Sequence, residues 1–150
     1  MSKHPATGSG LVLLMVLATL ATPTVAHAAP RCFGKAATIV GTSGRDRLVG
    51  TNGRDVIVGL GGRDRLLGRG GKDLLCGNDG GDLLTGGDGR DRLDGGRHGD
   101  GLKPGAGNDI IDGGKNDDNL SGSTGNDAVH GGAGDDILLG QSESDKLCGD

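Results

Sequence analysis

The chain reads GLGGRDRLL at residues 59–67 and GGAGDDILL at residues 131–139. These are two of twelve nine-residue units that follow one another from Gly41 to Cys148 without insertion or deletion. The eighth residue is Leu, Ile or Val in all twelve units, and the sixth is always Asp. The aspartates are Asp46, Asp55, Asp64, Asp73, Asp82, Asp91, Asp100, Asp109, Asp118, Asp127, Asp136 and Asp145. A fixed period of this length predicts a repeat architecture in which stacked units share one core.

Each unit divides into a turn and a strand. The first five residues are rich in glycine and other turn formers, as in GTSGR at 41–45. Residues six to nine read Asp-x-aliphatic-x, which predicts a short β-strand. Because side chains alternate between the two faces of a strand, the sixth and eighth residues share a face. The aliphatic residue is the only constant apolar group, so we expect both side chains to point into the interior.

Inward carboxylates need a charge partner, because an unpaired ionised carboxylate is costly to bury. Many of the bases stand at the fifth or seventh position, such as Arg45 and Arg47, and alternation turns these outward. A hard cation held by carboxylate and backbone carbonyl oxygens meets the need, and Ca²⁺ accepts oxygen cages of variable geometry. All twelve aspartates are therefore predicted to bind Ca²⁺ together with loop carbonyls.

The units resemble the G-G-x-G-x-D-x-U-x nonapeptide of the RTX, or haemolysin-type, calcium-binding repeat family. GGDGRDRLD (86–94) and GGAGDDILL (131–139) match every fixed position. The resemblance implies an all-β fold, a right-handed parallel β-roll with two units per turn, in which odd and even units build separate sheets. It also implies that units n and n+2 share a Ca²⁺ ion between their loops.

The two loop edges differ at the fourth position of the unit. Gly occupies it in every even unit except the last, which has Glu143. Among the odd units, His98 and Asn116 replace Gly at this position. In addition, Pro104 replaces the leading Gly of unit eight, which is an even unit. Since His and Asn adopt left-handed backbone conformations less readily than Gly, we expect the weakest calcium loading near His98 and Asn116.

The composition indicates that the fold depends on the metal. The chain has 34 Gly and one aromatic residue, Phe33. One buried aliphatic side chain per unit offsets little of the backbone entropy that is lost on folding. We therefore expect a largely disordered chain without calcium, which folds when Ca²⁺ binds.

Residues 1–28 are predicted to be a secretory signal peptide. Lys3 provides the positive start, Leu11 to Ala21 is a short apolar core, and Ala26-His27-Ala28 fits the small-x-small cleavage pattern. The apolar core is shorter than the roughly 20 residues that a membrane-spanning helix needs. The sequence therefore predicts a secreted, extracellular protein without a membrane span in its mature form.

The mature chain then has three parts: a lead-in at residues 29–40, the repeats at 41–148, and a C-terminal end at 149–150. Residues 32–40 are in phase with the repeats, but Ala37 replaces the Asp. We interpret the lead-in as a degenerate first turn that caps the roll. It supplies the strand Thr38–Val40 without a metal-binding carboxylate.

The three cysteines predict one disulfide bond. Cys76 and Cys148 both stand at the ninth position of even units, four strands or about 19 Å apart, and a disulfide needs Cα atoms within about 7 Å. Cys32 can reach Cys76 from the lead-in. We therefore predict a Cys32–Cys76 disulfide, with Phe33 covering an apolar strip beside Cys76. Cys148 is then free or intermolecular.

The charges and motifs narrow the function classes. Residues 31–103 hold thirteen bases and ten acids, whereas residues 104–150 hold two bases and ten acids. The chain is acidic overall and has only one aromatic residue for base stacking, so nucleic acid is not an expected partner. It has no nucleophile elbow, zinc signature or phosphate loop outside the repeats, so we expect no enzyme activity.

The predicted function is that of a secreted calcium-binding protein whose loops and inward aspartates hold Ca²⁺. The alternative is a calcium-rigidified extracellular adhesive or structural module. Such a module would bind a partner through its outer face, or associate with itself or a cell surface through the end that carries Cys148.

Overall fold

The computed structural model describes residues 28–149. Residues 1–27, and with them nearly all of the predicted signal peptide, lie outside the described residues. The described part contains fifteen β-strands and no helix.

The short strands of the N-terminal end are β1 (Arg31–Cys32), β2 (Lys35–Ala36), β3 (Ile39–Val40) and β4 (Arg47–Val49). The regular part of the fold contains β5 (Val56–Gly61), β6 (Arg65–Gly71), β7 (Leu74–Asp79), β8 (Leu83–Gly89), β9 (Arg92–Arg97), β10 (Gly101–Ala106), β11 (Ile110–Lys115), β12 (Asn119–Thr124), β13 (Ala128–Ala133), β14 (Ile137–Ser142) and β15 (Lys146–Cys148).

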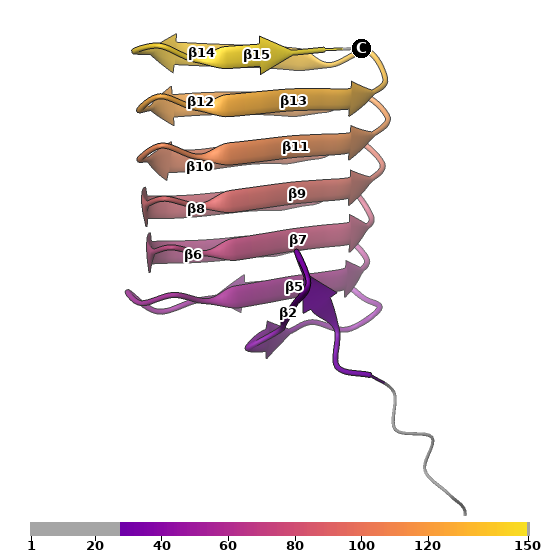
Figure 1. The fold of residues 1–150 in the computed structure, drawn as a ribbon. Helices are drawn as coiled ribbons and strands as arrows, with labels where there is room; N and C mark the ends of the chain where they lie inside the picture. The colour runs from indigo at the N-terminus through magenta and orange to yellow at the C-terminus, as the bar shows by residue number, and fades with distance from the viewer. Residues whose placement is uncertain (1–27, 150) are drawn as a thin grey trace, which may run out of the picture.

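Two parallel sheets face each other across a narrow interior. One sheet has six strands in the order β14-β12-β10-β8-β6-β4, and the other has seven in the order β15-β13-β11-β9-β7-β5-β3. Neighbouring strands are offset by eighteen residues, as in the pairing of Leu75 with Leu93. One turn therefore takes two units, and the chain winds upward as a stack of flat turns (Figure 1). The predicted all-β parallel roll is confirmed.

The strands extend further than predicted. We expected residues six to nine of each unit to form the strand, but β7 (Leu74–Asp79) spans the seventh to ninth residues of one unit and the first three of the next. The Asp lies just before the strand. Glycine-rich residues can extend the ladder because it needs only backbone N–H and C=O groups, and Gly96 pairs with Asn78 in this way. The turn shrinks accordingly to the fourth to sixth residues.

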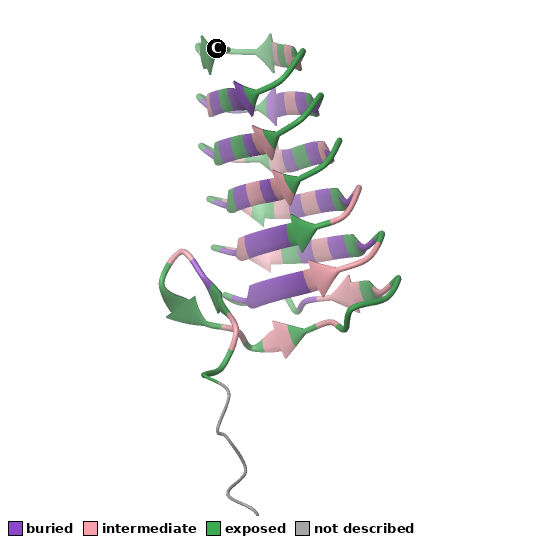
Figure 2. Ribbon diagram, turned by 90° about the vertical axis from the view of Figure 1, so that its right-hand side faces the viewer, coloured by how far each residue is buried: buried purple, intermediate pink, exposed green. Residues whose placement is uncertain are grey.

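The core is a single column of eighth-position side chains. Ile57, Leu66, Leu75, Leu84, Leu93, Leu102, Ile111, Leu120 and Val129 are buried in one cluster, and Ile39, Leu48 and Leu138 pack against it. Figure 2 shows the buried residues in purple on the strands in the middle of the stack. Each such side chain contributes roughly 1.5–3 kcal/mol. These side chains fill the space between the two sheets. The loops that connect one sheet to the other therefore lie along the two edges of the roll.

The first two loops differ from the later ones. Units three to twelve carry a positive φ at their second residue, for example 80° at Leu60 and 123° at Gly87. Units one and two have Thr42 and Thr51 there, and neither has a positive φ. A β-branched residue fits this left-handed region poorly. As a result, β3 and β4 stop at the ninth position.

The lead-in forms a cap on the outer face of the seven-stranded sheet. β1 and β2 pair as an antiparallel hairpin that the sequence did not predict, and β3 pairs with β5. The predicted Cys32–Cys76 disulfide is present, with Cα atoms 5.7 Å apart. Together with Val56 and Val58 the two cysteines form a second buried cluster, and Phe33 packs against it. The predicted cover over the apolar strip is therefore confirmed.

The last turn is more exposed than the rest. Ile137 is 56% exposed, Leu139 51% and Leu147 48%. Cys148 is exposed and unpaired. In the part of the chain that the structure describes, no helix has the length and apolarity needed to cross a membrane.

Candidate metal sites along the loop edges

The repeated pattern of the units places one carboxylate at every loop, and therefore two in every turn of the roll. Nine aspartates are at most 6% exposed, and the structure confirms the predicted inward orientation for them. They are Asp55, Asp64, Asp73, Asp82, Asp91, Asp100, Asp109, Asp118 and Asp127. Asp46, Asp136 and Asp145, in the end turns, are half-buried. Odd units stack their aspartates along one edge, and even units along the other.

One oxygen of these carboxylates ties successive turns together. The backbone N–H of Asp55 donates to Oδ1 of Asp73 at 2.8 Å, and that of Asp73 donates to Oδ1 of Asp91 at 2.8 Å. The same bond recurs from Asp46 to Asp145 along both edges, at 2.7–2.9 Å. The aspartates therefore link units n and n+2 directly.

The second oxygen has no partner over most of the roll. Oδ2 is buried without a hydrogen bond in nine aspartates, which are Asp64, Asp73, Asp82, Asp91, Asp100, Asp109, Asp118, Asp127 and Asp136. A buried acceptor without a donor costs about 1–3 kcal/mol, and more when it is charged. These atoms are a set of interior sites that lack a positive partner.

Asp46 and Asp55 are different because a threonine satisfies their Oδ2. Thr42 donates to Oδ2 of Asp46 from its backbone N–H at 2.6 Å and from its hydroxyl at 2.9 Å. Thr51 does the same for Asp55, at 2.6 and 3.0 Å. Sequence reasoning treated all twelve aspartates alike. The signal it missed was Thr at the second position, which only units one and two carry.

The orphaned oxygens face a backbone carbonyl across the first-position glycines. A Cβ atom placed on Gly59 would lie 2.6 Å from Oδ2 of Asp64 and 2.8 Å from the carbonyl oxygen of Gly77. The carboxylate oxygen and a carbonyl oxygen of the next turn thus converge on one point. Glycine keeps this point open. In unit eight Pro104 occupies the position and is buried, and Oδ2 of Asp109 is orphaned there as well.

The buried environment disfavours ionisation of these carboxyls. Burial raises the pKa of Asp91 to about 7 and that of Asp100 to about 8, in spite of the N–H bond that each accepts. The stacked aspartates above and below raise these pKa values further. Burial likewise raises the pKa to about 6 in Asp82, Asp109 and Asp118. A cation beside Asp91 and Asp100 would therefore favour their charged form at neutral pH.

These residues fit a hard divalent cation. The converging donors are all oxygens, which is the ligand type that Ca²⁺ prefers. Among residues 28–149 no group of three or more His, Cys, Asp or Glu side chains is arranged to hold a metal. Each site would therefore combine a carboxylate with backbone carbonyls and water. The aspartates with an orphaned Oδ2 beside a first-position glycine meet this requirement. Asp46 and Asp55, and Asp109 beside Pro104, meet it less well.

The fourth-position replacements keep the regular turn. His98 has a φ of 79° and Asn116 a φ of 75°, in the left-handed region that glycines occupy in neighbouring units. The N–H of His98 donates to Oδ1 of Asn116 at 3.2 Å. Asp100 and Asp118, which follow them, remain stacked. The structure does not test calcium loading, so the weaker loading expected here stays a prediction. Its physical basis is the strain of a left-handed backbone at His98 and Asn116, because the loop itself is not disrupted.

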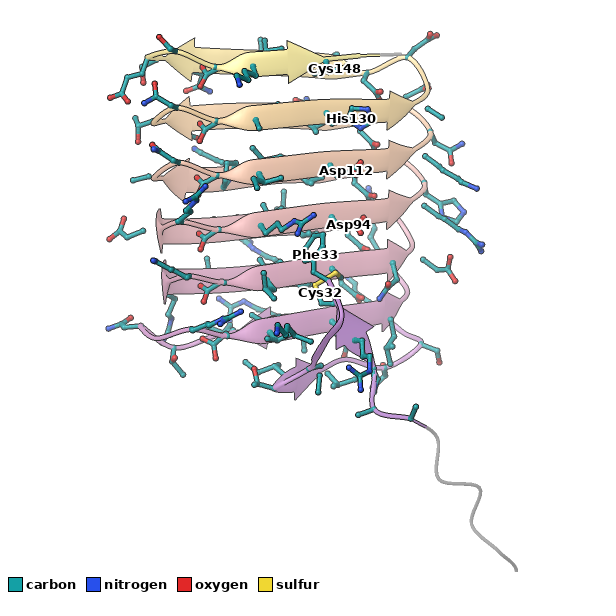
Figure 3. All side chains as sticks on the ribbon, viewed as in Figure 1. Cys32, Phe33, Asp94, Asp112, His130 and Cys148 are labelled. Atoms are coloured by element: carbon teal, nitrogen blue, oxygen red, sulfur yellow. A yellow bond between two sulfur atoms is a disulfide. The ribbon has the colours of Figure 1, made fainter. Side chains whose placement is uncertain are left out.

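The outer face of the seven-stranded sheet carries a second column of titratable groups. Asp94, Asp112, His130 and Cys148 follow one another at the ninth position, above Phe33 (Figure 3). Nδ1 of His130 lies 3.5 Å from Oδ1 of Asp112. Sequence analysis assigned no site to these residues. The sequence did contain a signal that they would be neighbours: all four occupy the ninth position of even units, and successive members are eighteen residues apart.

Comparison with known proteins identifies the repeats. The model of the RTX calcium-binding nonapeptide repeat matches the chain in four copies, at residues 40–75, 77–111, 105–127 and 112–147. A search of the curated proteins found no match.

Proposed function

The chain belongs to the RTX calcium-binding nonapeptide repeat family, and on this basis we propose that it is a secreted protein that binds several Ca²⁺ ions along both loop edges and folds as it binds them. The observation that carries the proposal is the row of orphaned Oδ2 atoms, nine in number, in the interior. A bound divalent cation would supply the positive charge that these carboxylates lack.

The residues of the chain have separate roles in this proposal. Asp64 and its equivalents would hold the cation through Oδ2, together with carbonyl oxygens such as that of Gly77. Oδ1 of the same residues would keep the turns in register through the bonds to the preceding turn. The eighth-position side chains would close the interior between the two edges. Metal binding and folding are coupled because each site needs two stacked turns.

Far-UV circular dichroism tests the proposal. In excess chelator we expect a spectrum of a largely disordered chain, and in millimolar Ca²⁺ a β-sheet spectrum. Mg²⁺ at the same concentration is the control, and it should have little effect because it demands a rigid octahedral site. Identical spectra with chelator and with Ca²⁺ would contradict the proposal.

Export and a non-enzymatic role belong to the same proposal. The signal-like segment at residues 1–28 and the Cys32–Cys76 disulfide both suit an oxidising extracellular setting. Calcium concentrations there would keep the roll loaded. Detection of the protein, cleaved after Ala28, in the culture medium would support this part, and retention of the full-length chain inside the cell would contradict it.

A second candidate function is that of a calcium-rigidified adhesive or structural module. A hollow of about 230 Å³ on the outer face favours it, because Phe33, Ile110 and Ala128 give this hollow an apolar lining. A partner bound there would be captured in Ca²⁺ and released in chelator. Capture that does not depend on calcium would count against this candidate.

A further inference from the structure

The fifth-position residues of the odd units form a column with an unusual order of charges. From the first turn to the last they are Arg45, Arg63, Gly81, Gly99, Asp117 and Asp135. This column lies on the loops that follow β3, β5, β7, β9, β11 and β13, on the right-hand edge in Figure 1. Two bases, two glycines and two acids therefore stand one above another, at about 4.8 Å per turn.

The charges of this column are not neutralised within the chain. Arg45, Arg63, Asp117 and Asp135 are exposed. In the described part of the chain the ion pairs are Arg97–Asp79 and His130–Asp112, and neither includes a member of the column. Like charges on adjacent strands repel each other. The column therefore has a positive cluster at one end and a negative cluster at the other, and it is about 24 Å long.

We propose that two copies of this chain associate side by side and antiparallel through this edge, related by a two-fold axis that passes between Gly81 and Gly99. A two-fold axis there places Arg45 opposite Asp135 of the second copy and Arg63 opposite Asp117 of the second copy. Each contact occurs twice, which is the property of an isologous interface. The inference rests on the fold and on the charge pattern, and not on the function proposed above.

Neighbouring positions fit the same axis. At the third position of the odd units, Asp79 faces Arg97 of the second copy. At the fourth position, His98 faces Gly80 of the second copy and Asn116 faces Gly62, so that the larger side chains meet glycines. At the centre of the column the lack of side chains allows the two backbones to approach. Arg45, Arg63, Gly81 and Gly99 line a hollow of about 500 Å³ at this edge.

The opposite edge provides an internal comparison. Its fifth-position column reads Arg54, Lys72, Arg90, Asn108, Asn126 and Ser144, with bases but no acids. A two-fold axis on this edge would place the bases opposite neutral residues. It is therefore not self-complementary, and the charge pattern selects the odd edge alone.

Charge reversal tests the interface in the calcium-loaded protein by sedimentation equilibrium. The first variant is Arg45→Glu/Arg63→Glu, and the second is Asp117→Arg/Asp135→Arg. Each alone should raise the dimer Kd at least about tenfold, because like charges then face each other. An equimolar mixture of the two should form a heterodimer, and the variant with all four changes should dimerise again. The control, Arg54→Glu/Arg90→Glu, should leave the Kd unchanged.

Salt and fold provide the remaining readouts. The dimer should weaken as ionic strength rises, since the contacts are exposed charge pairs. Circular dichroism in Ca²⁺ should show the same β-sheet content in all variants, so that loss of the dimer is not loss of the fold. Monomeric native protein at every concentration, or a dimer that neither reversal weakens, would overturn the proposal. Binding of the odd edge to an added polyanion without any self-association would overturn it as well.

Discussion

At the scale of single residues, the two oxygens of each aspartate have different tasks. In Asp73, Oδ1 accepts the N–H of Asp55 and Oδ2 has no donor. In Asp46, Oδ2 already accepts two bonds from Thr42. The same residue type at the same repeat position is therefore poised for a cation in one unit and satisfied by the protein in another.

This difference predicts unequal effects of one substitution. Asp73→Asn should lower the number of bound Ca²⁺ ions in isothermal titration calorimetry and raise the calcium concentration at the folding midpoint several-fold, because an amide is a poor calcium ligand. Asp46→Asn is the matched control and should leave the stoichiometry unchanged. Equal losses in both variants would show that the threonine bonds do not replace the metal.

The raised pKa values predict how the metal-free chain responds to pH. The pKa of an unfolded Asp is about 3.9, whereas burial raises the pKa to about 6 in Asp82, 7 in Asp91 and 8 in Asp100. Between these limits the folded state binds more protons, so its stability is greatest at low pH and is lost as pH rises towards 8. In chelator, β-sheet ellipticity should therefore increase from pH 8 to pH 5.

Calcium should show the opposite dependence, because protons compete for the same carboxylates. The calcium midpoint of folding should rise as pH falls from 8 to 5. A metal-free chain whose β-sheet content increases with pH would contradict the assignment of these buried carboxyls.

At the scale of elements, the hairpin β1–β2 covers part of the outer face of the seven-stranded sheet and is bonded covalently to it. Its Cys32 is joined to Cys76 on β7, forty-four residues later in the chain. The bond holds the hairpin over Val56 and Val58, which would otherwise be exposed on that face. The guanidinium of Arg92 lies 4.1 Å from the centre of the Phe33 ring and extends the cover towards β9.

Removal of this disulfide should destabilise the loaded roll. The variant Cys32→Ser/Cys76→Ser should lose about 2–4 kcal/mol of unfolding free energy in urea with saturating Ca²⁺, since the open chain regains entropy. Cys148→Ser, which removes an exposed thiol, is the control and should have little effect. An unchanged denaturation midpoint in the double variant would mean that the hairpin does not stabilise the roll.

At the scale of the whole molecule, burial decreases towards the last turn. Leu93 is fully buried in the middle of the stack, whereas Leu147 on β15 is 48% exposed. The first turns are held by the disulfide and the second cluster. In a stack of repeats stability depends on nearest neighbours, so a turn with one neighbour opens most easily.

Hydrogen exchange measured by mass spectrometry should show this gradient in the calcium-loaded protein. Amides of β7, β9 and β11 should exchange slowest, and those of β14 and β15 fastest, because local opening there breaks contacts on one side only. The N-terminal strands should be protected as long as the disulfide is intact. Protection of β15 equal to that of β9 would contradict this gradient.

The sequence by itself determined the parallel roll, the eighth-position core, the inward aspartates and the Cys32–Cys76 bond. The core and the inward aspartates follow from a nine-residue period with one aliphatic and one acidic residue in phase, and from the alternation of side chains along a strand. The parallel roll follows from the resemblance of the units to the RTX nonapeptide, and the disulfide from the spacing of the strands. Such features depend on local periodicity and on the spacing of strands, and both can be read without coordinates.

The tertiary structure alone decided which oxygen of each aspartate is bonded, that Thr42 and Thr51 close the first two loops, and that residues 31–36 form a hairpin. It also showed that the strands continue through the glycines of the next unit. Some of these features depend on contacts between residues eighteen positions apart, such as Asp55 and Asp73. Others depend on the exact geometry of a local contact, such as that between Thr42 and Asp46. In both cases the atoms must meet at distances of about 3 Å. Periodicity places such residues in neighbouring turns, but only the stacked backbone determines which donor reaches which acceptor.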